Sequence, residues 1–472
     1  MNAIAPVLRL LLPALLLPLI AATSAPAADV RPAADPNRNP RRQAKTPNIV
    51  LILADDLGYG DLGCYGQTKI LTPNIDRLAA EGMRFTQAYA GNTVCAPSRC
   101  ALMTGKHSGH GRVRSNVQVP LESEDVTIAE VLKSAGHHCG AFGKWALGWE
   151  GTTGIPNRQG FEEWLGYLDQ AHAHDYYPAM LWRNEELQYA LPGNQDGKRG
   201  DYAPNLFQKA AGNFIRINED DPFFLYFPTT IPHANNERGT NGMEVPSLGA
   251  YGKMDWPEPE KAKAAMISRL DAFVGALMED LKKRKIDQDT LILFTSDNGP
   301  HKEGGVDPRF FASSGPFRGI KRDLYEGGIR VPLIARWPGR IKPGAVNALP
   351  VASWDLLPTL ADLVDRTPPK DVDGISVLPT FFGATPKRTH AYLYWESHEK
   401  GYLQAVREGD WKGVKLDADK PLELYDLAND PAETQDVATA NPDVVKRLES
   451  HMKAAADPWS QPQERSPFLK KK

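Results

Sequence analysis

Four short runs of apolar residues constrain the fold of this chain more than any other feature. They cover residues 48–53, 223–227, 290–295 and 331–335. Each run is almost continuously apolar and does not alternate with polar residues, which is typical of strands buried on both faces of a parallel sheet. The four runs therefore predict the centre of a mostly parallel β-sheet.

Segments with a helical spacing of apolar residues separate these runs. Residues 74–80, 126–135 and 260–283 each place apolar side chains on one face. Gly82 and Gly136 follow the first two segments and favour helix ends. Strands that alternate with helices indicate an α/β fold in which helices sandwich the sheet.

A second, smaller domain is predicted after a proline-rich, charged segment at residues 366–373. Short strand candidates separated by turn residues follow at residues 391–394, 403–406 and 411–414. A helix is predicted after them at residues 442–454. This pattern predicts a small α+β domain with an antiparallel sheet. The expected divisions are a catalytic domain at residues 46–375, a small domain at residues 385–460 and a tail at residues 461–472.

The N-terminus has the organisation of a secretory signal. Arg9 precedes an apolar run at residues 10–20, and small residues follow at 21–28. This order predicts a signal peptide at residues 1–28 and then a flexible leader at residues 29–45. We expect a secreted or periplasmic protein with no stable membrane span after cleavage, because the apolar run is too short for one. An uncleaved membrane anchor is the alternative.

Charge and cysteine content narrow the class of function. The 472 residues carry a formal net charge of −3, and the basic block at residues 470–472 is the one that stands out, so no nucleic-acid partner is expected. Four cysteines in an exported chain of this length make no disulfide framework. A pairing of Cys64 with Cys139 stays open on the sequence alone.

Polar residues directly follow three of the predicted strands. Asp55 and Asp56 follow the first run, His233 lies just past the second, and Asp297 and Asn298 follow the third. Ligands of open α/β sheets bind beyond the carboxyl ends of the strands, so these side chains are expected in one crevice. Carboxylate and amide oxygens suit Ca²⁺ or Mg²⁺ better than zinc. Acidic pairs that only cap helices or close turns are the alternative.

The run Cys95-Ala96-Pro97-Ser98-Arg99 precedes a segment with helical character. Pro97 is well placed in a first helical turn, because its missing N–H group is no loss there. Cys95 would then lie at a helix N-terminus, where the helix dipole favours an anion. A buried and inert thiol is the alternative.

These residues resemble the type I sulfatases, the formylglycine-dependent family of the alkaline phosphatase superfamily. The family signature is Cys-x-Pro-Ser-Arg followed by Leu-x-Thr-Gly, and this chain has it at residues 95–99 and 102–105. Further segments are similar in family order, at residues 54–60, 72–78, 295–299, 325–330 and 424–427. The similarity covers roughly residues 46–455. It implies an alkaline phosphatase-like fold and a sulfuric ester hydrolase of the arylsulfatase or exo-acting glycan sulfatase kind.

The resemblance implies an unusual nucleophile at residue 95. In such enzymes a separate maturation enzyme oxidises the motif cysteine, here Cys95, to formylglycine. One hydroxyl of the hydrated aldehyde attacks sulfur, and the alcohol leaves. Loss of the proton from the second hydroxyl then releases sulfate and restores the aldehyde. A serine or cysteine could form the covalent ester but lacks this route of release.

The resemblance also implies a divalent cation, Ca²⁺ or alternatively Mg²⁺, which polarises the sulfuryl group. Its ligands would be Asp55, Asp56, Asp297, Asn298 and the residue-95 oxygen. Arg99, Lys144 and Lys321 map onto the cationic positions that hold sulfate oxygens. His233 maps onto the histidine that protonates the leaving oxygen as a general acid.

One departure from the family concerns the element Gly-Lys-Trp-His-Leu-Gly, in which this chain has Ala146 in place of the histidine. That histidine ordinarily helps to deprotonate the diol and release sulfate. We expect another imidazole to compensate, and the candidates are His107, His172 and His174. The same three residues could instead bind substrate.

The expected reaction is hydrolysis of sulfate monoesters, on a sulfated carbohydrate with aryl sulfates as surrogates. Residues 182–184 and Trp256 could line a sugar subsite. Two alternatives stay open: a phosphoester or phosphonate hydrolase on the same scaffold, and a non-catalytic binder of sulfated glycans. Cys95 in the full signature disfavours the first, and the intact set of charged residues disfavours the second.

Overall fold

The computed structural model describes residues 46–117, 119–399 and 401–459. The predicted signal peptide, leader and C-terminal tail lie outside these residues. Within them, no helix combines the length and apolar character needed to cross a membrane.

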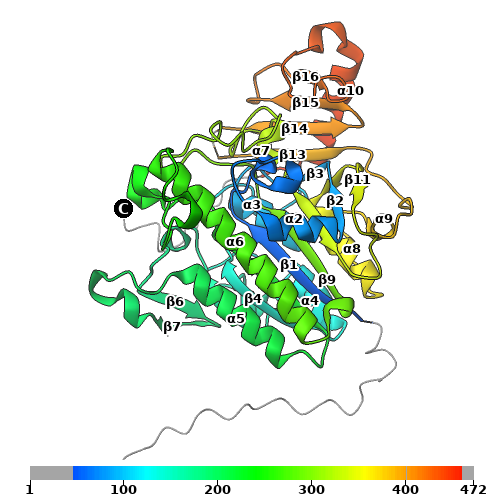
Figure 1. The fold of residues 1–472 in the computed structure, drawn as a ribbon. Coiled ribbons are helices and arrows are strands. Elements are labelled where there is room, and N and C mark those ends of the chain that lie inside the picture. Colours follow the sequence, from blue (N-terminus) through cyan, green and yellow to red (C-terminus); the bar gives the residue numbers. More distant parts are fainter. Residues whose placement is uncertain (1–45, 118, 400, 460–472) are drawn as a thin grey trace, which may run out of the picture. The chain divides into compact units, whose positions relative to one another are not determined.

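A ten-stranded sheet forms the larger part of the described structure (Figure 1). Its strand order is β11-β2-β10-β9-β1-β8-β4-β5-β6-β7. The five central strands are parallel to one another: β9 (Thr290–Ser296), β1 (Asn48–Ala54), β8 (Phe223–Pro228), β4 (His138–Lys144) and β5 (Glu163–Tyr167). The runs at 48–53, 223–227 and 290–295 are therefore buried parallel strands, as predicted.

The fourth apolar run is a strand but not a parallel one. β10 (Leu333–Arg336) pairs antiparallel with β9. The connection between these strands, residues 297–332, contains the short helix α7 (Glu326–Ile329) and no crossover helix along the sheet. Because a parallel neighbour requires a crossover, the chain must re-enter the sheet from the edge at which β9 ended.

Short strands complete both sides of the sheet. They are β2 (Met83–Phe85), β11 (Ala345–Asn347), β6 (Met180–Arg183) and β7 (Glu186–Ala190). A separate two-stranded sheet joins β3 (Ala88–Tyr89) to β12 (Val351–Ala352).

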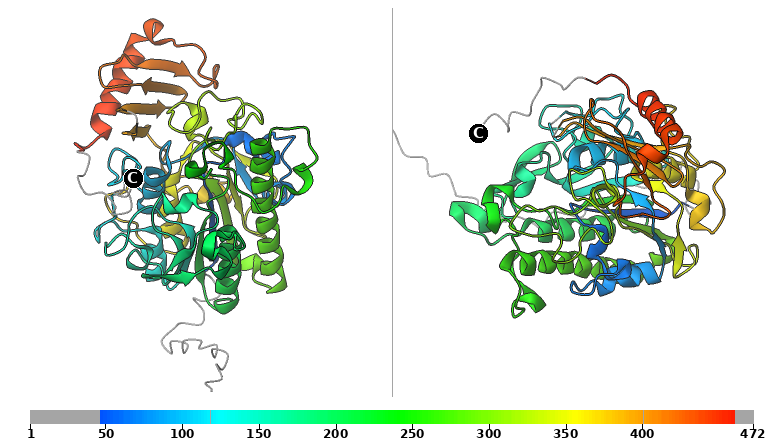
Figure 2. Two further views of the ribbon diagram at one scale, coloured as in Figure 1. Left: turned by 90° about the vertical axis from the view of Figure 1, so that its left-hand side faces the viewer. Right: turned by 90° about the horizontal axis from the view of Figure 1, so that it is seen from above.

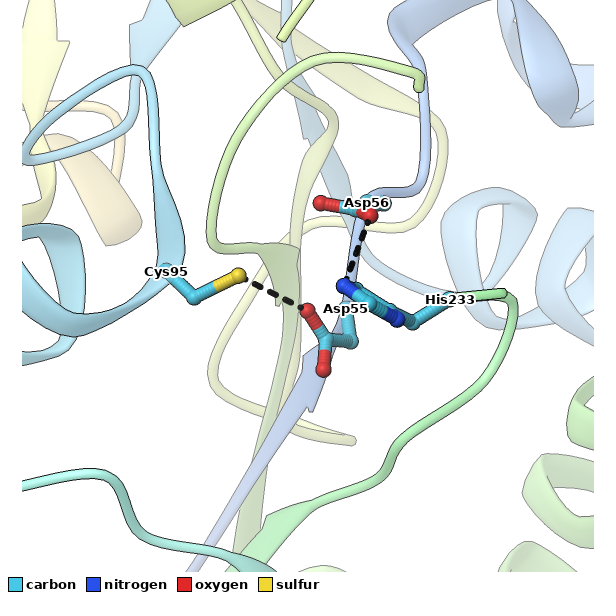
Figure 3. Close-up of side chains that lie close together, drawn as sticks. All are labelled: Asp55, Asp56, Cys95 and His233. Carbon is cyan, nitrogen blue, oxygen red and sulfur yellow. Dashed lines mark hydrogen bonds and ion pairs between the residues drawn. The ribbon is translucent and has the colours of Figure 1, made fainter. Parts of the chain in front are cut away.

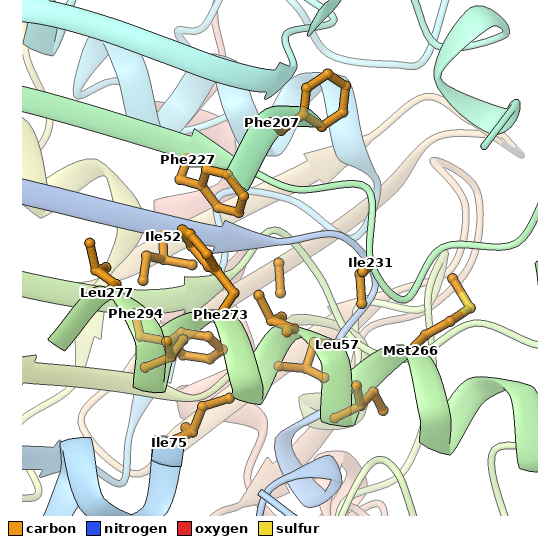
Figure 4. Packing of buried hydrophobic residues seen from close by; sticks show 14 of the residues in the cluster. Ile52, Leu57, Ile75, Phe207, Phe227, Ile231, Met266, Phe273, Leu277 and Phe294 are labelled. Carbon is orange, nitrogen blue, oxygen red and sulfur yellow. The ribbon is translucent and has the colours of Figure 1, made fainter. Parts of the chain in front are cut away.

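Helices cover both faces of the large sheet. Helices α2 (Pro73–Ala80), α5 (Ala203–Ile217) and α6 (Glu258–Lys283) pack on one face. Phe227 of β8 stacks on Phe273 of α6 with ring centroids 4.2 Å apart, within the cluster drawn in Figure 4. The other face is covered by α3 (Cys95–Thr104), α4 (Ile128–Ser134) and α8 (Leu356–Leu363), with α9 (Leu378–Phe381) beside them.

A four-stranded antiparallel sheet follows in the C-terminal part of the chain. Its strands are β13 (Leu393–Ser397), β14 (Leu403–Glu408), β15 (Trp411–Lys415) and β16 (Glu423–Asp426), and helix α10 (Pro442–Ala455) packs on one face (Figure 2). The other face packs on the large sheet's domain, where Trp395 contacts Tyr89 and Trp354. The α/β sandwich with a smaller antiparallel sheet is thus confirmed.

A buried cluster of charges joins the small sheet to the rest of the protein. Lys412 of β15 lies 3.0 Å from Glu326 and 2.9 Å from Glu433. Glu326 begins α7 and also accepts hydrogen bonds from Tyr89 and Arg330. We call these five residues the interface cluster.

All four cysteines are free thiols, so Cys64 and Cys139 are not paired. The Cys139 thiol donates a weak hydrogen bond to the carbonyl of Ala129 at 3.5 Å.

Candidate active site

Two parallel strands bring the acidic residues together. β1 and β9 pair in register through Ala54 and Ser296, so the residues that follow each strand emerge side by side. The backbone N–H of Asp56 donates to Oδ1 of Asp297 at 3.0 Å. Parallel pairing of β1 and β9 therefore brings four polar residues together, Asp55, Asp56, Asp297 and Asn298. We call these four residues the acidic group.

The acidic group offers oxygen atoms that fit a divalent cation. Nδ2 of Asn298 donates to Oδ1 of Asp56 at 2.6 Å, so the other atom of this amide, Oδ1, lies next to the acidic residues. That oxygen is buried and has no hydrogen-bond partner among the described residues. A buried, unpartnered amide oxygen is costly, and a hard cation would satisfy it. Asp55, Asp56, Asp297 and Asn298 thus fit a calcium or magnesium ion.

Cys95 is the first residue of α3 and points into this acidic group. The preceding Val94 is extended, so the helix begins at the motif cysteine. Sγ of Cys95 donates to Oδ1 of Asp55 at 3.3 Å, as Figure 3 shows. Ligand atoms of Asp55, Asp56, Cys95 and His233 all lie within 4.8 Å of one another. The sulfur stands in for the oxygen that residue 95 would carry after oxidation.

Two cations with fully buried side chains flank Cys95. Lys144, the last residue of β4, places Nζ 2.7 Å from Oδ2 of Asp55. Arg99, one helical turn after Cys95, donates to Oδ2 of Asp297 at 2.8 Å and to the carbonyl of Lys144 at 2.6 Å. Their positions are fixed because each is hydrogen bonded and excluded from solvent.

A third cation comes from the loop before α7. Gly299 donates through its N–H group to the carbonyl of Gly328 at 2.9 Å, which holds this loop against the end of β9. A Cβ atom at Gly328 would lie 1.9 Å from the carbonyl oxygen of Asp323, so only glycine permits the approach. Lys321 then places Nζ 2.8 Å from Oδ2 of Asp56.

His233 completes the cluster from the loop after β8. Its Nδ1 atom lies 2.6 Å from the carbonyl of Ala234 and must donate to it. Nε2 therefore carries the lone pair in the neutral ring, and it lies 3.1 Å from Nζ of Lys321. Lys321 donates this hydrogen bond.

Burial and charge together set the protonation states. Burial would raise the pKa of Asp55, but the surrounding cations, with Lys144 foremost, hold it well below its usual range. Burial and then the charge of Asp55 raise the pKa of Asp297 to about 7. Burial, followed by the charge of Lys321, holds the pKa of His233 well below its usual value. The crowding that raises the pKa of Asp297 is what a divalent cation would relieve.

Burial also raises the pKa of the Cys95 thiol, and the charge of Asp55 adds to that effect. The thiol therefore stays protonated at neutral pH and is a poor nucleophile. An unmodified cysteine is thus badly suited to attack an anionic ester here.

The three histidines considered as substitutes for the missing imidazole lie in different places. The ring of His174 stacks on His233 with centroids 4.9 Å apart, and its Nδ1 lies 3.1 Å from Glu237. His172 packs edge-on against Tyr167. His107 lies beyond the far end of α3, about 15 Å along the helix from Cys95. Of the three, only His174 touches the site.

His107 belongs to another cluster, with His110 and Asp373. Its Nδ1 accepts the backbone N–H of Gly109 at 3.1 Å, so Nε2 carries the proton and faces Asp373 at 3.5 Å. Burial lowers the pKa of His107 to about 4. A protonated Nε2 cannot bind a metal, so this cluster is a hydrogen-bonded support.

Two of the residues considered for a sugar subsite, Trp182 and Arg183, lie away from the site. Trp182 is buried in the core, 1% exposed. Nη2 of Arg183 lies 3.7 Å from Oε1 of Glu163, the first residue of β5, so this side chain lies toward the amino-terminal edge of the sheet and opposite the site. Trp256 packs against Tyr251, Phe310 and Phe311 in an aromatic group. Local sequence could not separate these packed aromatics from exposed ones.

The structure adds neighbours that the sequence did not single out. Buried His301 stacks near His233 with centroids 5.9 Å apart and accepts the N–H of Glu303 at 3.1 Å. Arg322, next to Lys321, forms an ion pair with Glu303. In the sequence, His301 follows Asn298 by three residues and Arg322 directly follows Lys321. This closeness to predicted site residues was the signal from which both could have been found.

Two further neighbours come from distant segments. Oδ1 of Asn116 accepts the N–H of Ala96 at 3.0 Å and the amide of Gln170 at 3.2 Å. Glu399, between β13 and β14, accepts the N–H of Asn116 at 3.0 Å. The small antiparallel sheet thus contributes a carboxylate close to Cys95. No local pattern in the sequence signals these contacts.

The fold and the polar site at the carboxyl edge of its sheet are those of an alkaline phosphatase-like hydrolase. Residues 47–366 match the family described as Sulfatase, and residues 318–457 match the family described as N-sulphoglucosamine sulphohydrolase, C-terminal. The chain belongs to the sulfatase family, and the protein is a sulfatase.

Known relatives agree with this assignment. Human arylsulfatase A is 34% identical, over 86% of this chain and 87% of its own. N-acetylgalactosamine-6-O-sulfatase of Bacteroides thetaiotaomicron is 29% identical, over 86% and 92%. The crystal structure of Ps i-CgsB in complex with k-i-k-neocarrahexaose is 28% identical with a TM-score of 0.78, and the match covers 90% of this chain and 96% of that one.

Proposed function

We propose that this protein hydrolyses sulfate monoesters through a formylglycine made from Cys95, with a divalent cation held by the acidic group. One observation carries the proposal: Cys95 begins α3 within 4.8 Å of Asp55, Asp56 and His233, and buried cations surround it. A sulfate monoester is an anion, and fixed cations in a dry site stabilise the charge that develops during its cleavage.

The proposed cation ligands are Asp55, Asp56, Asp297, Asn298 and the oxygen at residue 95. When bound, Ca²⁺ would supply Lewis acidity toward the sulfuryl oxygens. Its oxygen-only ligand set favours Ca²⁺, and Mg²⁺ is the alternative. The unpartnered Oδ1 of Asn298 and the raised pKa of Asp297 support this assignment.

Three groups of side chains have separate proposed roles. Arg99 and Lys144, whose positions are fixed beside Cys95, would bind sulfate oxygens. Lys321 and His233 share a hydrogen bond, and this pair would deliver the proton to the leaving oxygen. Formylglycine, when present, supplies a hydroxyl nucleophile and a second hydroxyl that permits release of sulfate.

His174 is the imidazole that we propose helps to deprotonate the diol and release sulfate, the role of the family's histidine that Ala146 replaces in this chain. Its stacking on His233 places it beside the Lys321–His233 pair, and Glu237 fixes its ring. We expect His174→Ala to slow sulfate release, measured as a burst followed by a reduced steady rate. Because His172 packs on Tyr167, His172→Ala is the matched control, and equal release rates in both variants would contradict the role of His174.

A sulfated saccharide is the proposed substrate, and aryl sulfates are proposed as surrogates. The names of two relatives support this: one is an N-acetylgalactosamine-6-O-sulfatase and another is an arylsulfatase. The complex of Ps i-CgsB with a neocarrahexaose also supports a saccharide. The signal-like N-terminus supports a secreted or periplasmic location, and Cys95 requires a maturation enzyme as partner.

The test combines chemistry and mass spectrometry. Protein produced together with a formylglycine-generating enzyme is supplied with Ca²⁺ and offered matched sulfate and phosphate monoesters of one alcohol. We expect sulfate turnover to exceed phosphate turnover, and residue 95 to be oxidised in the active protein. Faster phosphate turnover would favour a phosphoester hydrolase. Binding of a sulfated glycan without turnover would favour a non-catalytic binder, and a thiol at residue 95 in active protein would contradict the proposal.

A further inference from the structure

Arg322 occupies a backbone conformation that is unfavourable for arginine. It follows Lys321 directly, and its φ angle is +79°. The left-handed region is unfavourable for a non-glycine residue, and such backbone strain clusters at active sites and ligand-binding segments. The backbone N–H of Arg322 donates to the carbonyl of Thr93 at 3.0 Å, which fixes the residue next to the motif helix.

The guanidinium of Arg322 has unused hydrogen-bond donors. Nη1 contacts Glu303. In the part of the chain that the structure describes, its Nε and Nη2 atoms have no acceptor, and 23% of the side chain is exposed. Although burial opposes it, the charges of Glu303, Asp56 and Glu399 act on Arg322 and raise its pKa. The arginine therefore lies, with one edge open to solvent, beside the residues that we call the catalytic cluster after their proposed role: Asp55, Asp56, Cys95, Arg99, Lys144, His233, Asp297, Asn298 and Lys321.

Glu399, in the loop between β13 and β14, is tied to the same stretch of chain as Arg322. Arg322 bonds to Thr93 and Asn116 bonds to Ala96, on either side of Cys95. The Oε2 atom of Glu399 accepts the N–H of Asn116, whose side chain accepts the N–H of Ala96. Two hydrogen bonds therefore link this carboxylate to the neighbour of Cys95. Oε1 of Glu399 and Nδ2 of Asn116 make no hydrogen bond within the described residues. An open acceptor and an open donor thus lie on this side of the site.

We propose that Arg322, Glu399 and Asn116 form a subsite for adjacent hydroxyl groups of the sugar that carries the sulfate ester, and that this subsite disfavours a second acidic group on that sugar. The inference rests on the proposed function. A guanidinium edge and a carboxylate can together donate to and accept from two neighbouring hydroxyls.

The balance of charge argues for hydroxyls over a second anion. Glu303 already neutralises Arg322, and Glu399 adds one negative charge nearby. A second sulfate or a carboxylate would be repelled by Glu399, because like charges without a partner are unfavourable in a partly buried site. The substrate class is therefore a singly sulfated sugar with a free vicinal diol.

The experiment compares kcat/KM for three esters: a singly sulfated monosaccharide with a free diol, its disulfated analogue and a small aryl sulfate. Arg322→Gly removes the guanidinium and suits the φ angle of +79°. We expect the ratio of kcat/KM for the singly sulfated sugar over the aryl sulfate to fall about ten- to a hundredfold, mainly through KM. Arg322→Lys keeps the charge without the planar fork and should restore only part of the ratio.

Glu399→Gln tests the second half of the inference. It keeps an acceptor oxygen for Asn116 and removes the charge, so turnover of the disulfated sugar should rise relative to the singly sulfated one. Arg158→Gln is the matched control, because Arg158 forms an exposed ion pair with Glu185 at 3.0 Å near the opposite edge of the sheet. Both ratios, that of the singly sulfated sugar to the aryl sulfate and that of the disulfated to the singly sulfated sugar, should be unchanged in Arg158→Gln.

Two outcomes would overturn the subsite while leaving the proposed function intact. One is an equal loss for all three esters in Arg322→Gly. The other is a loss confined to the disulfated sugar, which would make Arg322 an anion-binding residue. If the wild-type protein, oxidised at residue 95, turned over none of the esters, the proposed function itself would fail and the subsite with it.

Discussion

Two of the buried clusters of charge in the described residues differ in their construction, and one of the two is built like a site. In the interface cluster, Lys412 is enclosed by Glu326 and Glu433, and Glu326 is further bonded to Tyr89 and Arg330. These charges are paired within the protein and join two sheets. Removing Lys412 would leave Glu433 buried without a cation.

The catalytic cluster has similar burial but a different arrangement. Its acidic residues follow the ends of strands, and its cations come from α3, β4 and a loop. Oδ1 of Asn298 stays unpartnered within the described residues, whereas Oε1 of Glu433 in the interface cluster lies 2.9 Å from Nζ of Lys412. Buried charge alone therefore does not indicate a site. A buried oxygen that neither a donor nor a cation of the protein satisfies is the stronger indication.

The largest expected difference between the clusters concerns Cys95. Cys95→Ser should form a sulfate ester and then stop, because serine lacks the second hydroxyl. Steady turnover should fall by about 10⁴-fold or more, with a burst near one equivalent. Cys100→Ala, one turn along α3 and equally buried, is the control and should retain turnover. Sustained turnover by Cys95→Ser would contradict the proposed release route.

The next prediction separates stability from activity. Lys412→Met leaves Glu433 without its cation and Glu326 with Arg330 alone, and should lower the free energy of unfolding by about 3–5 kcal/mol, measured by urea denaturation. The activity of the remaining folded protein should be unchanged. Lys144→Met should instead lower kcat by about 10²–10³-fold. If both variants lost activity to the same extent, the two clusters would not differ in kind.

Metal removal should affect the catalytic cluster alone. A chelator should lower the melting temperature, because a cation at 100 times its Kd stabilises the folded state by about 2.7 kcal/mol. Asn298→Ala should abolish this shift, since it removes the unpartnered oxygen. Glu433→Gln, in the interface cluster, should keep it. A shift of full size in Asn298→Ala would exclude that oxygen as a ligand.

The smallest expected effect is a pH dependence in the interface cluster. Burial, together with the charge of Glu326, raises the pKa of Glu433 from 4.5 to about 7 against the opposing effect of Lys412. Between these values the folded protein holds a proton that the unfolded chain has released. The resulting stability is complete below pH 4.5 and is lost as the pH rises through 7, with a slope of at most about 1.4 kcal/mol per pH unit.

The measurement for Glu433 is the difference in unfolding free energy between the wild type and Glu433→Gln across pH 4 to 8. The variant should lack this contribution, so the difference should vary only inside the window. A difference that stays constant with pH would show that folding does not raise the pKa of Glu433.

Short-range patterns in the sequence were sufficient to predict much of the fold. Continuous apolar runs identified β1, β8 and β9, and the residues directly after them proved to be neighbours because parallel strands end at one edge. The orientation of β10 was not predictable in the same way, since it depends on how the long connection after β9 returns. Periodicity reports burial and not strand direction.

Contacts between distant segments limited the prediction of the site. Glu399 and Asn116 are 283 residues apart, and neither lies in a recognisable motif. Trp182 and Trp256 resembled sugar-binding aromatics, but each packs against its own neighbours. An isolated aromatic residue in a sequence carries no information about which of its faces is covered.

If Cys95 is oxidised as proposed, its burial limits when during synthesis of the protein that oxidation can take place. All ten residues of α3 are buried, and Cys95 is 1% exposed. A second enzyme therefore cannot bind this segment once the protein around it has folded. Closure requires β9 and Asp297, which leave the ribosome about 200 residues after Cys95. At roughly 5–20 residues per second, the thiol stays accessible for about 10–40 seconds of translation. A chain that folds before it is oxidised would be trapped in an inactive form.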